Sequence, residues 1–271
     1  MAAASVLTTV YNGAGFVARY CETVRAASHL DMDWLLVDDG STDSTVDDTL
    51  VSLHAAGLAD RVQILRPGRL GRPGALNFGV TQVRTPVFFI HDFDDESWPV
   101  RYPAQLELLA SDGRLACVGG GYVHVWPALA REETRSLNFD PARYRRHFPL
   151  YVPFPHTLMA FRTEAVRQVG GYPDWDDYEE MGLIGRLLAA GWRLGAVNAV
   201  VGRHFVYPQS YFESRRSFAG RRLRNFRRQL SMRRELPFIA VSRVEIAARF
   251  AYSFLPTPIK RLMRERVGHA N

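Results

Sequence analysis

Apolar runs alternate with polar, glycine-bearing segments over the first hundred residues, and this rhythm is typical of strand–helix–strand units around a parallel sheet. The apolar runs predict buried strands at residues 5–10, 34–37, 61–65 and 87–90. Helices are expected over about 14–29, from the turn at 41–43 to about 56, and from 74 to 80. The first third therefore predicts an α/β fold.

The pattern is less regular after Trp98. It predicts a helix around 102–109, a strand at 116–119, a further apolar segment at 157–161, a helix at 181–190 and a strand around 193–201. Between Arg215 and Arg234, apolar residues recur at helical spacing with arginines on the other faces, which predicts an amphipathic basic helix.

Acidic side chains follow two of the predicted strands. Asp38 and Asp39 come after the second strand, and the cluster from Asp92 to Asp95 follows the fourth, which is too apolar to lie on the surface. Ligands of open parallel sheets bind outside the carboxyl ends of the strands. We therefore expect the two acidic groups to meet in one crevice.

The cluster Asp92-Phe93-Asp94-Asp95 predicts a divalent cation. Neighbouring carboxylates raise one another's pKa unless a cation lies between them. Mg²⁺ and Mn²⁺ are the natural candidates, since nucleotide sites hold such ions by one or two carboxylates together with water and phosphate oxygens. The alternative is a solvated acidic turn or a cap for the next helix.

Asp39, at the end of its strand, can accept a hydrogen bond from a base N–H or a ribose hydroxyl. Ser41 and Asp43 are equally well explained as caps of the next helix.

The chain has 271 residues, of which 47% are hydrophobic, so it can bury a large core. It can do so as one compact unit or as two closely fused subdomains. Cys21 and Cys117 lie far apart without metal-ligand spacing, so neither a disulfide scaffold nor a zinc site is expected and a reducing cytoplasm fits. Residues 1–10 do not resemble a signal peptide, and no run approaches the roughly 18 apolar residues of a membrane span. Export and membrane crossing are therefore not expected.

The formal charge of +6 is unevenly distributed. Arginines collect in residues 215–228, whereas acidic residues concentrate in 38–48, 92–96 and 174–180. An acidic cleft with a basic C-terminal part suits metal and phosphate better than duplex DNA, so no nucleic-acid partner is expected.

Four segments, in this order and spacing, resemble the nucleotide-binding half of the family 2 glycosyltransferases: residues 9–12, 37–43, 71–79 and 92–95. The resemblance implies a GT-A fold, with a Rossmann-like, mainly parallel sheet flanked by helices, then an acceptor-binding part and a helical tail. It also implies a nucleoside diphosphate sugar as donor, a divalent cation as cofactor and inversion at the anomeric carbon.

The same resemblance implies a donor site formed by Thr9, Tyr11, Asn12 and Asp39 around the base, Arg72 at the base or diphosphate, and Asp92 at the ribose. Asp94 and Asp95 are implied as metal ligands. His204, in Gly202-Arg203-His204, lies where family members carry an arginine and histidine pair, which implies a ligand or phosphate role; a packed loop histidine is the alternative.

A fainter match in the second half concerns the general base. In this family an acidic pair precedes a helical leucine and arginine, and the pair's second member is the base, which implies Glu180. Glu179, Asp177 and Asp176 are the rivals. The chain departs from the pattern in having glutamate where aspartate is usual, and Gly182 where a bulkier residue is common.

The chemistry explains why these parts occur together. A metal neutralises the leaving diphosphate, and a carboxylate on the opposite side takes the proton of the acceptor hydroxyl. The metal cluster and Glu180 are therefore expected to face each other across the sugar. His156, Gly120 and Trp175 are expected to line the sugar or acceptor pocket, and His91 to be structural.

We expect a nucleotide-sugar-binding half at residues 1–100, an acceptor-binding and catalytic-base half at 101–212, and a basic helical extension at 213–271. The donor nucleotide is expected to be UDP, dTDP or GDP, and the acceptor a saccharide, a lipid-linked glycan or a natural product. The basic helix is expected to pack on the catalytic unit, with an anionic membrane surface, a phosphorylated acceptor or a second copy as alternatives. A cytoplasmic protein, with peripheral contact at the inner membrane face, fits these expectations.

Three other classes compete with this interpretation. Nucleotidylyltransferases usually open with a glycine-rich loop bearing arginine and lysine, whereas the first strand here ends in residues 9–13, TVYNG. A receiver domain would leave the second acidic cluster and the second half unexplained. A non-catalytic, sugar-binding relative is the third alternative.

Overall fold

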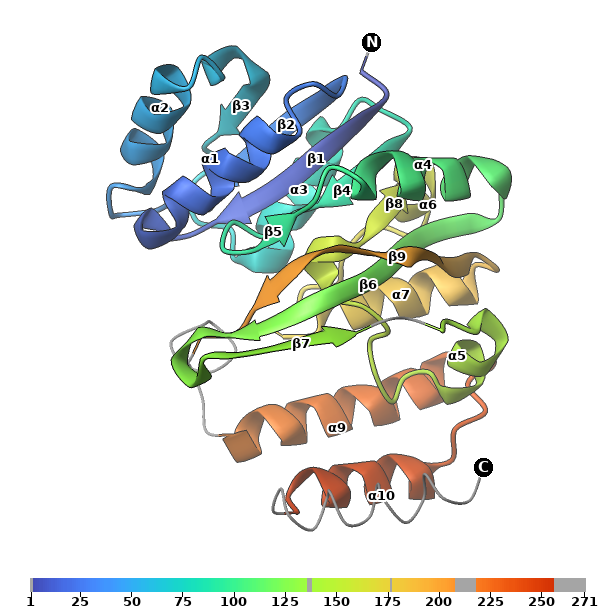
Figure 1. Cartoon of the computed structure of the whole chain (residues 1–271). Helices are drawn as coiled ribbons and strands as arrows, with labels where there is room; N and C mark the ends of the chain where they lie inside the picture. Colours follow the sequence, from blue (N-terminus) through green and yellow to red (C-terminus); the bar gives the residue numbers. More distant parts are fainter. Residues whose placement is uncertain (1, 136–137, 176, 208–217, 256–271) are drawn as a thin grey trace.

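The computed structural model describes residues 2–135, 138–175, 177–207 and 218–255. They contain a nine-stranded sheet in the order β3-β2-β1-β4-β8-β6-β9-β5, with β7 paired to β6 (Figure 1). The strands are β1 (Ala4–Val10), β2 (Met32–Asp38), β3 (Val62–Leu65), β4 (Val87–Ile90), β5 (Glu96–Ser97), β6 (Leu115–Trp126), β7 (Arg131–Arg135), β8 (Ala160–Arg162) and β9 (Arg193–Phe205).

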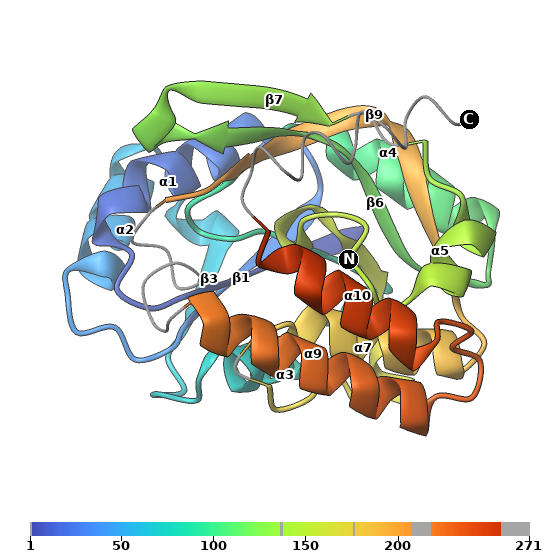
Figure 2. The ribbon, with the colours of Figure 1, turned by 90° about the horizontal axis from the view of Figure 1, so that it is seen from below.

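The α-helices lie on both faces of this sheet (Figures 1 and 2). They are α1 (Val17–Ala26), α2 (Thr45–Ala55), α3 (Arg72–Gln82), α4 (Arg101–Ser111), α5 (Pro141–His147), α6 (Thr163–Gln168), α7 (Glu179–Ala189), α9 (Phe218–Glu235) and α10 (Arg243–Ser253). The N-cap of α2 is Ser44, and the Asp43 carboxylate accepts a hydrogen bond of 3.1 Å from the Thr45 amide.

The first half of the sheet is parallel, as the pattern predicted. β1 pairs with β2 and β4, and β2 pairs with β3. Side chains alternate between two cores: Leu7 and Phe88 face one, whereas Val6 and Phe89 face the other. Because helices cover both faces, apolar residues occupy most positions of these strands.

The second half of the sheet is mixed, which corrects the expectation of a mainly parallel sheet. β8 lies antiparallel between β4 and β6, and β5 is antiparallel to β9, while β6 and β9 run parallel. An apolar run indicates a buried strand but not its direction.

β6 extends well beyond the predicted residues 116–119, through three consecutive glycines. A Cβ atom at Gly119 would lie 2.2 Å from the Phe154 ring, and one at Gly121 would lie 3.0 Å from the carbonyl oxygen of Arg135. Glycine is unfavourable in strands, so the sequence pattern did not predict that the strand continues through these glycines. Close packing requires glycine here.

The predicted basic helix is α9, and residues 215–217 of the prediction lie outside the described residues. The buried Met232 packs α9 onto the core, and α10 packs on α9 by stacking Phe250 on Phe226, with ring centroids 4.5 Å apart. Figures 1 and 2 show α10 outermost, at the end of the molecule remote from β3 and α2. Of the helices in the described residues, none is both long and apolar enough to cross a bilayer.

Candidate active site

The loops that follow β1 and β2 are cross-linked at the carboxyl edge of the parallel strands. Asn12 Oδ1 accepts a hydrogen bond of 2.8 Å from the Thr42 amide, and the Asn12 amide donates to Ser41 Oγ at 2.9 Å. Thr9 lies half-buried at the end of β1. Asn12 therefore shapes the edge of the predicted donor site, with its side-chain oxygen already engaged.

Asp39 and Tyr11 lie together with an arginine that the sequence did not single out. Buried Asp39 accepts hydrogen bonds at Oδ1 from the amides of Leu70 (2.6 Å) and Gly71 (3.0 Å), and its Oδ2 pairs with Arg69. The Arg69 guanidinium lies over the Tyr11 ring, 3.8 Å from the centroid. The predicted base site thus has a carboxylate, an aromatic ring and a cation.

Asp92 and Asp95 attach the acidic loop to neighbouring segments. Asp95 is buried, and it accepts hydrogen bonds from the Phe205 amide (2.7 Å) and from Nδ1 of His204 (2.9 Å). The Asp92 amide donates to Thr157 Oγ1 at 2.9 Å. Asp95 therefore attaches the acidic loop to the end of β9, which explains why His204 lies beside it.

Asp94 differs, because no other described residue donates a hydrogen bond to its carboxylate. Burial and the charges of Asp95 and Asp92 raise its pKa to about 7. Arg19 donates instead to the main-chain oxygen of Asp94, at 2.6 Å. Within the described ranges, no three His, Cys, Asp or Glu side chains already form a ligand set. A carboxylate that receives no hydrogen bond from another described residue fits a cation whose shell comes mostly from phosphate and water.

Arg72 joins the acidic residues of the two halves of the chain. Its Nε donates to Glu179 Oε1 at 2.6 Å, and its Nη2 donates to Asp92 Oδ1 at 3.0 Å. Asp92 lies after β4 and Glu179 begins α7, so the two acidic groups meet at one guanidinium. Attraction between Arg72 and Asp92 lowers the pKa of this carboxylate despite its burial.

His156 holds the arginine from another side. Nη2 of Arg72 lies 3.3 Å from His156 Nδ1, which must be the acceptor because a guanidinium has only donors. The imidazole proton is therefore on Nε2, which lies 2.9 Å from the hydroxyl of Tyr172. Burial and the charge of Arg72 lower the pKa of His156 to about 3, so the ring is neutral.

The three described candidates for the general base have different surroundings. Glu179 pairs with Arg72, and Asp177 pairs with Arg224 of α9 through an Nε–Oδ2 hydrogen bond of 2.9 Å. Glu180 has no salt bridge among the described residues, and burial together with Glu179 raises its pKa to about 8. Asp176 lies outside the described residues.

Close packing favours glycine at positions 120 and 182. A Cβ atom at Gly120 would lie 2.9 Å from both methyl groups of Val201, so close packing favours glycine here, and its place in the acceptor pocket stays a prediction. At Gly182 it would lie 2.9 Å from the ring of Trp175, which explains the departure from the family pattern. Arg228 lies over the same indole ring, 4.9 Å from its centroid.

Arg101 is a buried residue that sequence reasoning missed, because an arginine at the start of a helix normally reaches solvent. Its relative exposure is 0%, and all five guanidinium N–H groups are engaged. The acceptors are Gln105 Oε1, Ser97 Oγ and the main-chain oxygens of Ile90, Thr157 and Met159. Ile90 and Ser97 flank the acidic loop, so Arg101 fixes both of its ends.

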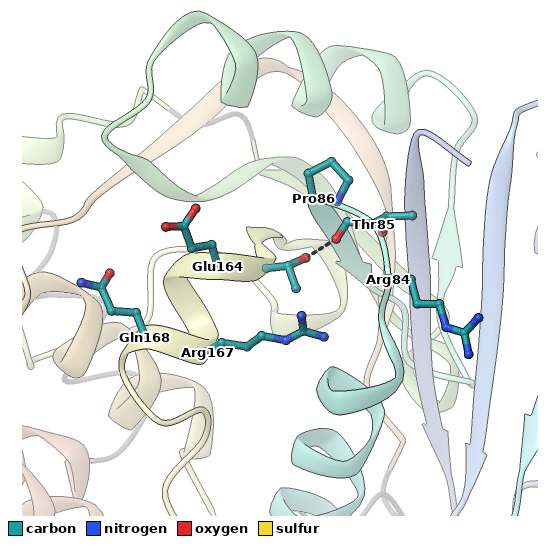
Figure 3. Close-up of a pocket in the computed structure, with 7 residues that line it drawn as sticks. Arg84, Thr85, Pro86, Glu164, Arg167 and Gln168 are labelled. Carbon is teal, nitrogen blue, oxygen red and sulfur yellow. Dashed lines mark hydrogen bonds between the residues drawn. The ribbon is translucent and has the colours of Figure 1, made fainter. Parts of the chain in front are cut away.

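A pocket of about 550 Å³ lies elsewhere, lined by Arg84, Thr85, Pro86, Thr163, Glu164, Arg167 and Gln168 (Figure 3). It lies where β4 begins and β8 ends, opposite the edge with the acidic loop. No predicted site residue lines it, so it is not the candidate active site.

The geometry at the carboxyl edge agrees with a comparison of the whole chain with known families. The model of glycosyl transferase family 2 matches residues 5–170. The chain belongs to this family. The resemblance seen in the sequence is thereby confirmed.

Curated relatives of this family member are distant. A Bacillus subtilis (strain 168) protein described as a glycosyltransferase, EpsE, is 27% identical over 169 residues, which are 62% of this chain and 59% of the relative. The uncharacterized glycosyltransferase alr2836 of Nostoc sp. is 31% identical over 91 residues, which are 34% of this chain and 28% of the relative. The chain thus spans less than two thirds of the relatives' own length.

Solved structures of other glycosyltransferases share the fold. The mannosyltransferase PcManGT from Pyrobaculum calidifontis, in complex with GDP-Man and Mn²⁺, has a TM-score of 0.62 at 16% identity, covering 99% of this chain and 80% of its own. TarS 1-349 of S. aureus, in complex with UDP-GlcNAc, has a TM-score of 0.67 at 13% identity, covering 93% of this chain and 71% of its own. These similarities confirm the GT-A fold class.

Proposed function

We propose that the chain transfers a sugar from a nucleoside diphosphate sugar to a hydroxyl acceptor, with inversion at the anomeric carbon. The observation that carries the proposal is the contact of Arg72 with both Asp92 and Glu179, since it brings the loop after β4 to the start of α7. Of Asp92, Asp94, Asp95, Asp177, Glu179 and Glu180, only Asp94 and Glu180 have no salt bridge to the described residues.

For the donor, we propose that Thr9, Tyr11, Asn12 and Asp39 surround the base, with Arg69 as an additional residue, and that Asp92 meets the ribose. Arg72 would meet the base or the diphosphate, and its Nη1 makes no hydrogen bond to the described residues. The candidate nucleotides are UDP, dTDP and GDP. Relatives of this fold bound to GDP-Man and to UDP-GlcNAc support a nucleotide sugar without selecting one.

We propose Mn²⁺ or Mg²⁺ as the cofactor, held by Asp94 and His204. Asp95, which the family resemblance implies as a further ligand, is proposed instead to orient His204, because both of its carboxylate oxygens already accept hydrogen bonds. A histidine that donates its Nδ1–H to a carboxylate keeps Nε2 as the ligand atom when the ring is neutral. Asp95 raises the pKa of free His204 to about 9, so binding of a cation there must release a proton. When bound, the cation would neutralise charge on the leaving diphosphate.

Glu180 is the proposed general base, because its rivals are engaged: Glu179 holds Arg72 and Asp177 holds α9. It would accept the proton of the acceptor hydroxyl during in-line attack. A pKa near 8 makes the carboxylate a stronger base than a solvent-exposed glutamate. The positive charge of a bound divalent cation would favour its ionised form.

The acceptor is proposed to bind in the part formed by residues 101–212, near His156 and Trp175, after the donor has bound to residues 1–100. A saccharide, a lipid-linked glycan and a natural product remain its candidate classes, and a homodimer and a location at the cytoplasmic membrane face remain proposals. Residues 213–271 form the proposed basic extension.

Thermal denaturation with a panel of nucleoside diphosphates, with and without Mn²⁺, tests the donor proposal, because a ligand of the native state raises the melting temperature. We expect one nucleotide to give the largest rise, and only with the metal. Hydrolysis of the matching nucleotide sugar then separates an active enzyme from a non-catalytic relative. Release of pyrophosphate from a nucleoside triphosphate and a sugar phosphate would instead identify a nucleotidylyltransferase.

A further inference from the structure

Helix α10 presents apolar side chains on its outer face as well as its inner face. Inside, Ile246 is fully buried and Phe250 stacks on α9. Outside, Val244 is 77% exposed, whereas Phe254, just past the helix, contacts Phe250 of α10 and Arg222 of α9 and belongs to the inner face. The exposed alanines of α10 continue this stripe at helical spacing: Ala247, Ala248 and Ala251.

The same two helices carry the positive charge of the chain. Residues 218–253 contain nine arginines and two glutamates, which gives 9 − 2 = +7, compared with +6 for the whole sequence. Arg243 and Arg249 are exposed on α10, and Arg227 and Arg234 are exposed on α9. The sequence of 256–271 adds four basic residues and one glutamate. Residues 1–217 therefore carry the remainder, 6 − 7 − 3 = −4.

We propose that the outer face of α10, together with the exposed arginines of α9, docks on an anionic lipid bilayer. Exposed apolar residues beside arginines suit the boundary between headgroups and acyl chains. There the apolar side chains are buried among the acyl chains, and the arginines are attracted to anionic headgroups. A second copy would bring another strongly positive surface against this one, and nucleic acid would leave the apolar stripe exposed in water. Charge complementarity therefore favours the bilayer.

The position of α10 relates this surface to the proposed acceptor site. Arg224 of α9 pairs with Asp177, which lies two residues before the first residue of α7, the helix that carries Glu180. Docking through α10 would hold the acceptor part of the molecule close to the membrane. The biological purpose of the contact rests on the proposed function, whereas the contact itself can be measured without donor or acceptor.

The test is co-sedimentation of the full chain with phosphatidylcholine vesicles and with vesicles that also contain phosphatidylglycerol. We expect binding to the anionic vesicles that weakens with added salt. Val244→Glu should weaken it about tenfold or more, because burying a valine contributes about 1.5–3 kcal/mol and each 1.4 kcal/mol is a factor of ten. Val51→Glu on α2 is the matched control, since Val51 is 69% exposed at the other end of the molecule.

Circular dichroism and nucleotide-induced thermal shifts establish that both variants remain folded. Absence of binding to anionic vesicles, or equal loss in the two variants, would overturn the proposal. Sedimentation velocity gives a further criterion: a dimer that Val244→Glu dissociates would assign the face to self-association. If the full chain binds anionic vesicles but transfers no sugar, the proposed function fails and the membrane contact stands.

Discussion

Arg72 Nε donates a hydrogen bond of 2.6 Å to Oε1 of Glu179, a residue 107 positions later in the chain. The same guanidinium reaches Asp92, so the donor side and the base side of the site are linked before any ligand binds. Glu179 is only 2% exposed. The link therefore fixes the position of the neighbouring Glu180.

Glu180→Gln should reduce sugar transfer by about 10² to 10⁴ with donor binding unchanged, because an amide cannot take the acceptor's proton. In the wild type, kcat should rise with pH towards the pKa of Glu180, about 8 or lower once the donor is bound, and then level off. Asp177→Asn is the matched control and should mainly loosen α9. A larger loss of kcat in Asp177→Asn than in Glu180→Gln would transfer the role of base to Asp177.

Asp94→Asn and Asp95→Asn should differ in their effects on stability. Asp94→Asn removes a carboxylate that its neighbours repel, so Mn²⁺-dependent donor binding should be lost while the apo melting temperature stays the same or rises. Asp95→Asn disturbs buried hydrogen bonds to Phe205 and His204 and should lower the free energy of unfolding by about 1–3 kcal/mol. Calorimetry with Mn²⁺ and nucleotide measures both effects. Unchanged metal-dependent binding in Asp94→Asn would contradict the proposed ligand.

The free energy of unfolding of the metal-free protein should fall as the pH rises from about 7 to about 9, a range in which the histidines with lowered pKa values, His91, His124 and His156, are neutral in both states. The pKa values of Asp94, Glu180 and His204 are raised on folding to about 7, 8 and 9, so each binds its proton more tightly in the folded state. That stability is present at acid pH and is lost as the pH passes each folded pKa. Mn²⁺ should reduce this loss of stability at high pH, because the bound cation takes the place of the protons on Asp94 and His204. Melting temperatures of the metal-free protein that rise over this pH range would contradict the raised pKa values of these three groups.

Arg72→Lys should weaken donor binding and lower stability together. An ammonium group cannot reproduce the planar set of donors that reaches Glu179, Asp92 and His156. A buried carboxylate that loses its charged partner costs about 3–5 kcal/mol, which denaturant titration can measure. Arg114→Lys, at an exposed position, is the control and should change neither quantity. Normal nucleotide affinity in Arg72→Lys would remove Arg72 from the donor site.

Arg101→Lys should raise the Mn²⁺ concentration needed for half-maximal donor binding, in protein that is still folded. Lysine offers three donors where Arg101 fills five acceptors, so the ends of the acidic loop would lose support. Destabilisation of about 2–5 kcal/mol is expected, because several buried oxygens lose partners. Arg84→Lys, at an exposed position, is the control. An unchanged Mn²⁺ requirement at reduced stability would limit Arg101 to a purely structural role.

The sequence by itself determined the parallel half of the sheet and the position of its acidic loops. Buried parallel strands need continuous apolar runs, as at Val87–Ile90, and polar residues directly after them fall at one edge. The four segments in register also sufficed to predict the family and the fold class, which the comparisons confirmed.

Only the tertiary structure decided which carboxylates are paired. Sequence places Asp177, Glu179 and Glu180 within four positions, and nothing in their order tells which receives an arginine. Arg224 and Arg72 come from distant elements, so their contacts depend on how α9 and α3 pack against α7. The same holds for Arg101 and for the apolar outer face of α10: burial depends on neighbours remote in sequence, which a local pattern does not contain.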